Sequence, residues 1–516
     1  MSKVVYLPLD ERPCNAKYPV QLASIADMPL VYPSADMLGK KKQPARHEDI
    51  AAWLVKETKD ATHLIVSVDM LVYGGIVPSR LHHLSESECL RRLSLLSELK
   101  RSNPSLEIHA FNLIMRAPAY NSSDEEPDYY EHYGYRLYRY GWLKDKAQYE
   151  TLGVEEQQER DRIAAEVPQE VLRDFLNRRQ VNAAVNLKAI SLVDEGIVDH
   201  LVIPLDDNAK YGFSPMEQRK LLTTVEQLNL LDRVLIYPGA DEIGCTLLAR
   251  VFCRLHGYRP EVFVRYSSTL GPTIVPKYED RSLNESIKSH LTSAGAVMAD
   301  SPSGADVVLM VHSPPVSQAD VAESPYAYSG RHRAYFSEVH IPEFAVAIES
   351  QLDKGRLVAL ADVASSNGSD HALMKLLSKK KLLGRLTAYA GWNTSGNTLG
   401  TVIAHAVIAS YWHGRAGSVP DRVKRASRAF LLSRYVEDWG YQTLVRKDVA
   451  ENHLPAMGGD YFRVGHIREQ VSALITEKLQ RFCRQYLSDV AEEADIARLR
   501  TDQPWNRMFE TDVTFE

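Results

Sequence analysis

The chain has 516 residues, a length that exceeds one small domain but fits either a large α/β barrel with appendages or two medium α/β domains. Its hydrophobic share of 45%, charged share of 25% and net charge of -6 are those of an ordinary globular protein, so they indicate no nucleic-acid or membrane partner. The five scattered cysteines never form a CxxC pair, which argues against a disulfide framework or a zinc knuckle. Since the sequence shows neither a leader-like start nor a long apolar run, we expect a cytoplasmic protein.

Ten short aliphatic runs, each ending in a polar or acidic cluster, are predicted as β-strands. In chain order they lie within residues 3–13, 29–37, 62–75, 106–118, 200–207, 233–242, 261–268, 305–315, 356–370 and 386–400. Their hydrophobicity is nearly continuous rather than alternating, which is typical of strands buried on both faces of a parallel sheet. Helical spacing of apolar residues predicts a helical excursion over about 125–192 and a helical subdomain over 413–516.

These elements predict an α/β fold, for which two architectures remain open. The preferred one is a (β/α)8-like barrel, in which residues 1–412 form a catalytic domain and 413–516 a helical C-terminal subdomain. Ten strands are two more than a barrel needs; if 29–37 is peripheral, 200–207 becomes the fourth barrel strand. The alternative is a pair of doubly wound α/β domains that divide near residue 255, with the site in the crevice between them.

Two adjacent carboxylates, Asp206 and Asp207, directly follow the strand predicted at 200–207. Alternating strand geometry would send them to opposite faces, so both reach one pocket only if the chain turns between them. Asn208 and the residues after it favour such a turn. A purely structural role, as the cap of the next helix, is less favoured because Ser214 already provides a cap there. The pair is therefore our candidate catalytic centre.

Polar residues at the other strand ends of the first half are predicted to contact the substrate. Asp241 and Glu242 follow the next strand, although an acidic pair is also what the start of a helix favours. Arg12 could pair locally with Asp10 instead of meeting a substrate. The full set of candidates in this half is Asp10, Arg12, Asp69, Tyr73, Arg80, Asn112, Arg116, Tyr211, Asp241 and Glu242.

The segment 389–401 offers an aromatic ring among neutral hydrogen-bonding groups. Trp392 is followed by Asn393 and Asn397, and sugars bind to such a combination of a flat apolar face and amides. A buried tryptophan beside an Asn-rich turn is the competing interpretation. Asp362 and Asn367 add polar groups after the preceding strand, and their spacing lacks the glutamate of an EF-hand calcium loop.

The usual motifs of several enzyme classes are missing from the sequence. It contains no GxGxxG after the first strand, no GxxxxGK[ST], no GxSxG and no HExxH, which are the marks of nucleotide-binding, serine-hydrolase and zincin sites. Histidines show no zinc-ligand spacing, and only His312 shares the strand-end position. We therefore expect neither a cofactor nor a metal.

Five segments carry a family resemblance: YLPLDERPCN, SVDMLVYGGIVPSR, IPLDDNAKYG, YPGADEIG and AYAGWNTSGNTLGT. Together they resemble the bacterial family of domain of unknown function 4127 over roughly residues 3 to 410. This resemblance implies a bacterial α/β protein and carries no established activity. The Asp-Asp pair on a fourth barrel strand, with a tryptophan on the last strand, is more distantly similar to the barrel-fold hexosaminidases that use substrate assistance.

These observations favour a glycoside hydrolase that acts on a small 2-acetamido sugar conjugate or oligosaccharide. Asp206 would orient the acetamido group, Asp207 would serve as general acid and base, and Trp392 would stack on the sugar. Three alternatives stay open. They are ordinary two-carboxylate hydrolysis, a metal-dependent hydrolase or lyase with Asp206, Asp207, Asp241 and Glu242 as ligands, and a sugar-binding protein without chemistry. The expected partner is a carbohydrate, and the oligomeric state is open.

Overall fold

The computed structural model describes residues 2–322, 330–414 and 418–515. By internal packing the chain divides into two compact units, each containing one of the two large parallel sheets. The first unit comprises Met1–Ala16, Pro29–Gly244 and Tyr278–Asp280, and the second comprises Lys17–Met28, Cys245–Lys277 and Arg281–Glu516. Both units are therefore assembled from separate stretches of sequence.

The first unit is built on a six-stranded parallel sheet with the strand order β2-β1-β3-β4-β5-β6. Its strands are β1 (Val4–Leu7), β2 (Leu30–Val31), β3 (His63–Ser67), β4 (Glu107–Phe111), β5 (His200–Leu205) and β6 (Val234–Pro238). Every residue of β1, β3 and β5 is buried, as their continuous hydrophobicity predicts for a sheet covered on both faces. The order 2-1-3-4-5, extended by a sixth strand, is a doubly wound arrangement.

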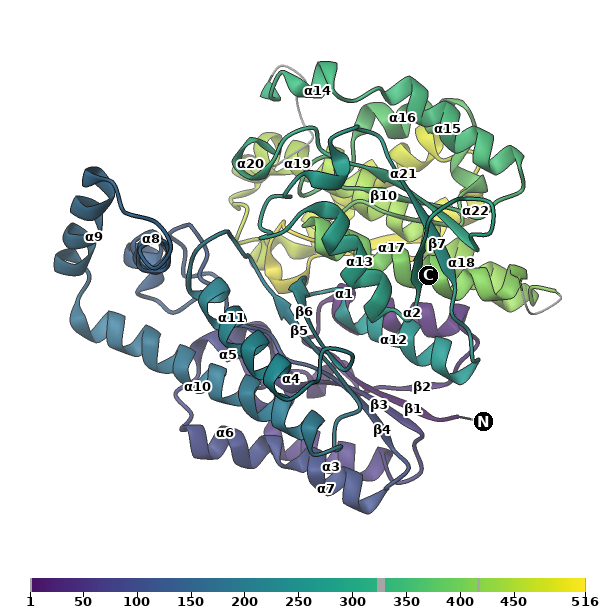
Figure 1. The fold of residues 1–516 in the computed structure, drawn as a ribbon. Helices are drawn as coiled ribbons and strands as arrows, with labels where there is room; N and C mark the ends of the chain where they lie inside the picture. The colour runs from purple at the N-terminus through teal and green to yellow at the C-terminus, as the bar shows by residue number, and fades with distance from the viewer. Residues whose placement is uncertain (1, 323–329, 415–417, 516) are drawn as a thin grey trace. The chain divides into compact units, whose positions relative to one another are not determined.

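Helices of the first unit follow most of these strands, and several share one apolar core with the sheet. They are α1 (Pro13–Ala16), α3 (His47–Glu57), α4 (Val68–Tyr73), α5 (Ile76–Leu81), α6 (Glu86–Leu93), α7 (Leu95–Ser102), α8 (Tyr130–Lys146), α9 (Val154–Glu166), α10 (Gln169–Asp194) and α11 (Phe213–Gln227). The long helix α10 packs against α6 and α11 (Figure 1). Helices α8, α9 and α10 fill most of the segment 125–192, and Tyr130, Phe175 and Phe213 belong to a smaller core of their own.

The second unit contains a five-stranded parallel sheet with the order β11-β10-β9-β7-β8. Its strands are β7 (Glu261–Tyr266), β8 (Val297–Ala299), β9 (Val307–His312), β10 (Val358–Asp362) and β11 (Ala388–Ala390). Read from the other edge, this order repeats the 2-1-3-4-5 pattern of the first sheet. Each sheet changes direction between its first and third strands, β1 and β3 in the first sheet and β7 and β9 in the second. On one side of this point lies the second strand, and on the other side lie the later strands.

The α-helices of the second unit accompany this sheet, and the last of them ends at Arg498. They are α2 (Tyr18–Ile25), α12 (Ile243–Leu255), α13 (Leu283–Ser293), α14 (Ala334–Ser337), α15 (Ile341–Asp353), α16 (His371–Lys379), α17 (Ser395–Gly414), α18 (Asp421–Arg434), α19 (Arg446–Asn452), α20 (Leu454–Met457), α21 (Arg468–Tyr486) and α22 (Glu493–Arg498). Residues Tyr435–Val445 form a π-helical segment between α18 and α19. Within the described residues, no helix combines the length and the apolar character that crossing a bilayer requires.

Two features differ from the expected architecture. The α/β class with parallel strands is confirmed, but the (β/α)8 barrel is not, because the strands form two open sheets instead of one closed one. The C-terminal region is also not purely helical: β12 (Leu499–Asp502) and β13 (Asp512–Phe515) pair as antiparallel strands. These strands are four residues long, which is too short for a clear period-two pattern.

Candidate functional site

The two adjacent aspartates lie on a turn at the carboxyl end of β5. Asp207 adopts a φ of 42°, in the left-handed region that side chains rarely occupy outside turns. The chain therefore leaves strand geometry between the two residues, as a shared pocket requires. The side chains of Asp206 and Asp207 are 15% and 19% exposed, so both carboxylates remain within reach of solvent.

Two arginines from other segments hold the aspartate pair. Arg80, on α5, donates from Nη2 to Oδ2 of Asp206 at 2.8 Å, and Arg116, after β4, donates from Nη1 to Oδ2 of Asp207 at 2.9 Å. The Arg116 Nε atom also lies 4.0 Å from Oδ2 of Asp206. Both carboxylates thus face the same guanidinium, and the structure brings together four residues that the sequence predicted as site members.

Glu125 and Glu126 complete this cluster and were not among the predicted site residues. Glu125 accepts from Arg80 at 2.9 Å and Glu126 accepts from Arg116 at 2.8 Å. With them the cluster holds four carboxyl groups and two guanidinium groups. In the sequence they are two adjacent glutamates before Pro127, a pattern typical of a solvated acidic run. Only the contacts of Glu126 with Arg80 and Arg116 explain why it is buried.

The electrostatics of the cluster keep part of Asp207 protonated near neutral pH. Burial and the neighbouring charge of Asp206 raise the pKa of Asp207 to about 7, against the lowering effect of Arg116 and Arg80. Burial also raises the pKa of Glu126, although both arginines oppose it. A carboxyl group that titrates near pH 7 can give a proton and take it back, which is the property of a general acid and base.

A second carboxylate cluster joins the loops after β1 and β6. Arg12 Nη2 donates to Oδ2 of Asp10 and to Oδ1 of Asp241, both at 2.6 Å. Asn15 Nδ2 donates to Oδ1 of the same two aspartates, at 3.0 and 3.1 Å. Burial raises the pKa of Asp10 even though Arg12 lowers it. The competing interpretation of Arg12 as a local ion-pair partner is thus seen in the structure, and it extends to Asp241.

The remaining predicted residues of the first unit have separate surroundings. Asp69 accepts from the Leu113 N–H at 2.9 Å and from Asn112 at 3.3 Å, and burial raises its pKa to about 6. The Tyr73 ring stacks on His82 with centroids 4.6 Å apart. Two further candidates make local or neighbouring contacts: Glu242 accepts from the Ala240 N–H at 2.9 Å, and the Tyr211 hydroxyl donates to Glu150.

The predicted residues of the second unit lie around the ends of β10 and β11. Trp392 is 5% exposed, packs edge-on against Tyr18 and donates its indole N–H to Thr401 at 3.3 Å. A sugar could stack on this indole ring only if the side chains that bury it moved. The backbone N–H of Asn367 donates to the carbonyl of Asn393 at 2.8 Å, and the side chain of Asn397 is buried. The sugar-contact role of these residues stays a prediction.

A histidine-centred cluster occupies the point between β7 and β9 where the second sheet reverses direction. His312 Nδ1 lies 2.9 Å from the hydroxyl of Ser267, and His312 Nε2 lies 3.5 Å from Oδ2 of Asp370. Asp370 is also held by Arg331 at 2.9 Å and caps α16. Burial raises the pKa of Asp362, next to His312 in the sheet register, to about 6. The sequence singled out His312 and Asp362 but gave no sign of Ser267.

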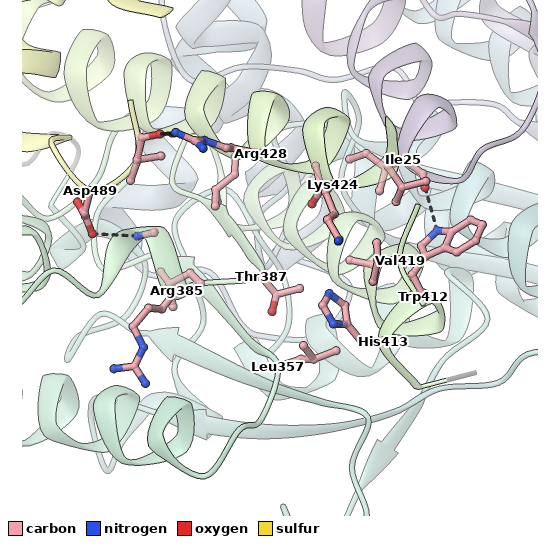
Figure 2. A pocket seen from close by; sticks show the side chains of 17 residues that line it. Ile25, Leu357, Arg385, Thr387, Trp412, His413, Val419, Lys424, Arg428 and Asp489 are labelled. Carbon is pink, nitrogen blue, oxygen red and sulfur yellow. Dashed lines mark hydrogen bonds between the residues drawn. The ribbon is translucent and has the colours of Figure 1, made fainter. Parts of the chain in front are cut away.

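A cavity of about 340 Å³ lies in the second unit, and Figure 2 shows the side chains that line it. It lies at the amino edge of the sheet, where Leu357 and Thr387 precede β10 and β11. Its wall includes the basic side chains of Arg385, Lys424 and Arg428 (Figure 2). None of the predicted site residues, all of which the structure describes, lines this cavity, so it does not correspond to the predicted site.

The metal-dependent alternative finds little support in the arrangement of its proposed ligands. In the described part of the chain, no three of Asp206, Asp207, Asp241 and Glu242 bring oxygen atoms within 4.8 Å of one another. Asp241 is instead paired with Arg12. A hard cation prefers six or more oxygen ligands, so these carboxylates would have to rearrange to bind one.

Comparison with known proteins gives one match. No curated protein and no solved structure matches the chain, so the distant similarity to hexosaminidases is not shown. The family model described as "Protein of unknown function (DUF4127)" matches residues 4–514, nearly the whole chain, including the C-terminal region beyond the segments that carried the resemblance. The chain therefore belongs to the DUF4127 family.

Proposed function

We propose that this protein is a glycoside hydrolase in which Asp207 is the general acid and base and Asp206 is its partner carboxylate. The observation that carries the proposal is the shared arginine: both carboxylates face Arg116 from one turn at the end of β5. Adjacent residues at a strand end can thus work in one pocket. The proposal uses only residues of the first unit.

Each aspartate of the pair keeps one oxygen for a substrate. The hydrogen bonds and ion pairs of Asp206 and Asp207 with described residues all use Oδ2. The Oδ1 atoms make no such bond, and neither of them is fully buried, so solvent reaches both. One Oδ1 can accept an N–H from the substrate while the other gives a proton to the leaving oxygen.

This division of roles suits a 2-acetamido sugar. In substrate-assisted hydrolysis the acetamido oxygen attacks the anomeric carbon, so the protein needs no nucleophile of its own. Asp206 would accept the acetamido N–H and stabilise the ring-closed intermediate. Asp207, with a pKa of about 7, would protonate the departing oxygen and then remove a proton from the attacking water.

Leaving-group dependence tests the two roles. Asp207→Asn should lose about 10²–10⁴-fold activity on 2-acetamido glycosides with poor leaving groups but keep more on activated aryl glycosides, which depart with little protonation. Asp206→Asn should slow both substrates alike, because the intermediate forms whichever group leaves. Asp232→Asn, at an exposed aspartate, is the matched control and should retain wild-type rates.

Three results would overturn the proposal. The first is near-wild-type turnover by both Asp206→Asn and Asp207→Asn, and the second is full activity on glucosides that lack the acetamido group. The third is loss of activity in EDTA that magnesium, manganese or calcium restores, since that outcome assigns the same carboxylates to a metal.

A further inference from the structure

Polar side chains begin three neighbouring strands of the first sheet, at the edge opposite to the Asp206–Asp207 turn. His63 starts β3, Glu107 starts β4 with His109 two residues later, and His200 starts β5. The parallel register pairs His63 with Glu107 and His109 with His200. Because residues two apart on a strand, and residues paired in register, share a face, these four side chains lie on one face of the sheet.

Three of these four side chains, those of His63, Glu107 and His109, place potential metal-binding atoms close together. Glu107 Oε2 lies 3.7 Å from His63 Nε2 and 3.8 Å from His109 Nε2. One ligand atom from each residue lies within 4.8 Å of the other two. Bonds of about 2.0–2.1 Å in a tetrahedral site place ligands roughly 3.4 Å apart, so the three side chains would have to move slightly closer together around an ion.

The surroundings orient one imidazole for this task. His63 Nδ1 lies 2.9 Å from the hydroxyl of Thr62, and donation of the Nδ1 proton to that hydroxyl leaves the Nε2 lone pair directed toward Glu107. The rings of His63 and His109 lie nearly parallel, at 18°. Both histidines are buried, whereas the Glu107 side chain is 32% exposed and gives an ion a path from solvent.

We propose that His63, Glu107 and His109 bind a divalent transition-metal ion of the zinc class. Two neutral imidazoles and one carboxylate suit such an ion, which takes three protein ligands and leaves a fourth position to water. His200, whose ring centroid is 6.4 Å from that of His109, is a further imidazole on the same face of the sheet. The ion would link β3 to β4 at the amino edge, away from the proposed catalytic turn, so this site is independent of the proposed function.

Zinc titration of the tag-free chain, stripped of metal beforehand, tests the site. We expect one Zn²⁺ per chain by elemental analysis after gel filtration, and a rise in melting temperature on addition of Zn²⁺, because the ion binds the folded form. Glu107→Gln keeps the size of the side chain and removes its charge, and should weaken Zn²⁺ binding at least about 10-fold. Glu98→Gln, at an exposed glutamate on α7, is the matched control and should bind as wild type does.

A second variant guards against misfolding as an explanation. His63→Gln should lose Zn²⁺ binding while its far-UV circular dichroism and gel-filtration volume stay those of the wild type. Hydrolytic activity, where it is present, should survive in Glu107→Gln, which separates failure of this site from failure of the proposed function. Absence of bound Zn²⁺ at micromolar concentration, or equal binding by wild type, Glu107→Gln and His63→Gln, would overturn the proposal.

Discussion

Replacing Asp207 by asparagine should make the protein more stable above neutral pH. Its pKa is about 7 in the folded chain against an ordinary value of 3.8, so the folded state prefers the protonated carboxyl. For an acid with a raised pKa, the stability is greatest below the unfolded pKa and falls as the pH rises toward the folded pKa. Asparagine stays neutral and keeps a similar shape, so the variant should lack this loss.

The size of the effect follows from the two pKa values. A difference of about three units at about 1.4 kcal/mol per unit gives an upper limit of about 4 kcal/mol for the cost of ionising Asp207 in the folded chain. Linkage spreads this cost over the range from pH 4 to 7, so roughly 2–3 kcal/mol of it should develop between pH 5 and pH 8.

Urea unfolding at pH 5 and pH 8 measures the difference. Wild type should lose more stability between these pH values than Asp207→Asn, and the variant should be the more stable protein at pH 8. Asp232→Asn, which alters an exposed aspartate, should follow the wild type at both pH values. A parallel pH dependence of wild type and Asp207→Asn would refute the raised pKa, and so would a variant that is less stable at pH 8.

Two other buried charge clusters give a prediction each, one on the loss of a cation and one on the pH dependence of stability. Arg12→Met should cost about 3–5 kcal/mol, seen as a lower melting temperature, because Asp10 and Asp241 would face each other without their shared cation; an unchanged melting temperature would contradict the buried pairing. Burial lowers the pKa of His312, but Asp370 and Asp362 together outweigh this effect and the pKa is raised. The stabilisation from His312 is therefore full below about pH 6.5 and declines at higher pH, so His312→Gln should be more destabilising at pH 6 than at pH 9; an equal loss at both would contradict this.

The strands could be located from the sequence because burial on both faces leaves a continuous apolar run. Each of the ten predicted runs contains a strand, from β1 at Val4–Leu7 to β11 at Ala388–Ala390. Strand β8 was missed because its three residues, Val297–Ala299, are only half-buried and too few to form a run. Closure of the sheet was not predictable, since barrels and doubly wound sheets both bury their strands and differ in tilt and stagger, which hydrophobicity does not record.

The candidate site was only partly predictable, for a reason that its residues make clear. The turn at Asp206 and Asp207 has local chemistry, so the sequence could indicate it. Its partners depend on contacts across the fold: Arg80 is 126 residues from Asp206, and their bond has no local sign. Glu126 was missed because an acidic run normally stays in solvent, and Arg116 is what allows this residue to be buried.

Hydrogen-bonding capacity separates the two aspartate pairs of the first unit. All four carboxylate oxygens of Asp10 and Asp241 accept hydrogen bonds from Arg12, so this cluster is saturated and suits a structural clamp. Asp206 and Asp207 each use a single oxygen toward the described residues and keep the other exposed to solvent. A substrate gains most from groups whose bonding capacity is unused in the free protein, because it then breaks no existing ion pair. This difference supports our proposal that the catalytic site lies at the end of β5, although the sheet reverses direction at β1 and β3.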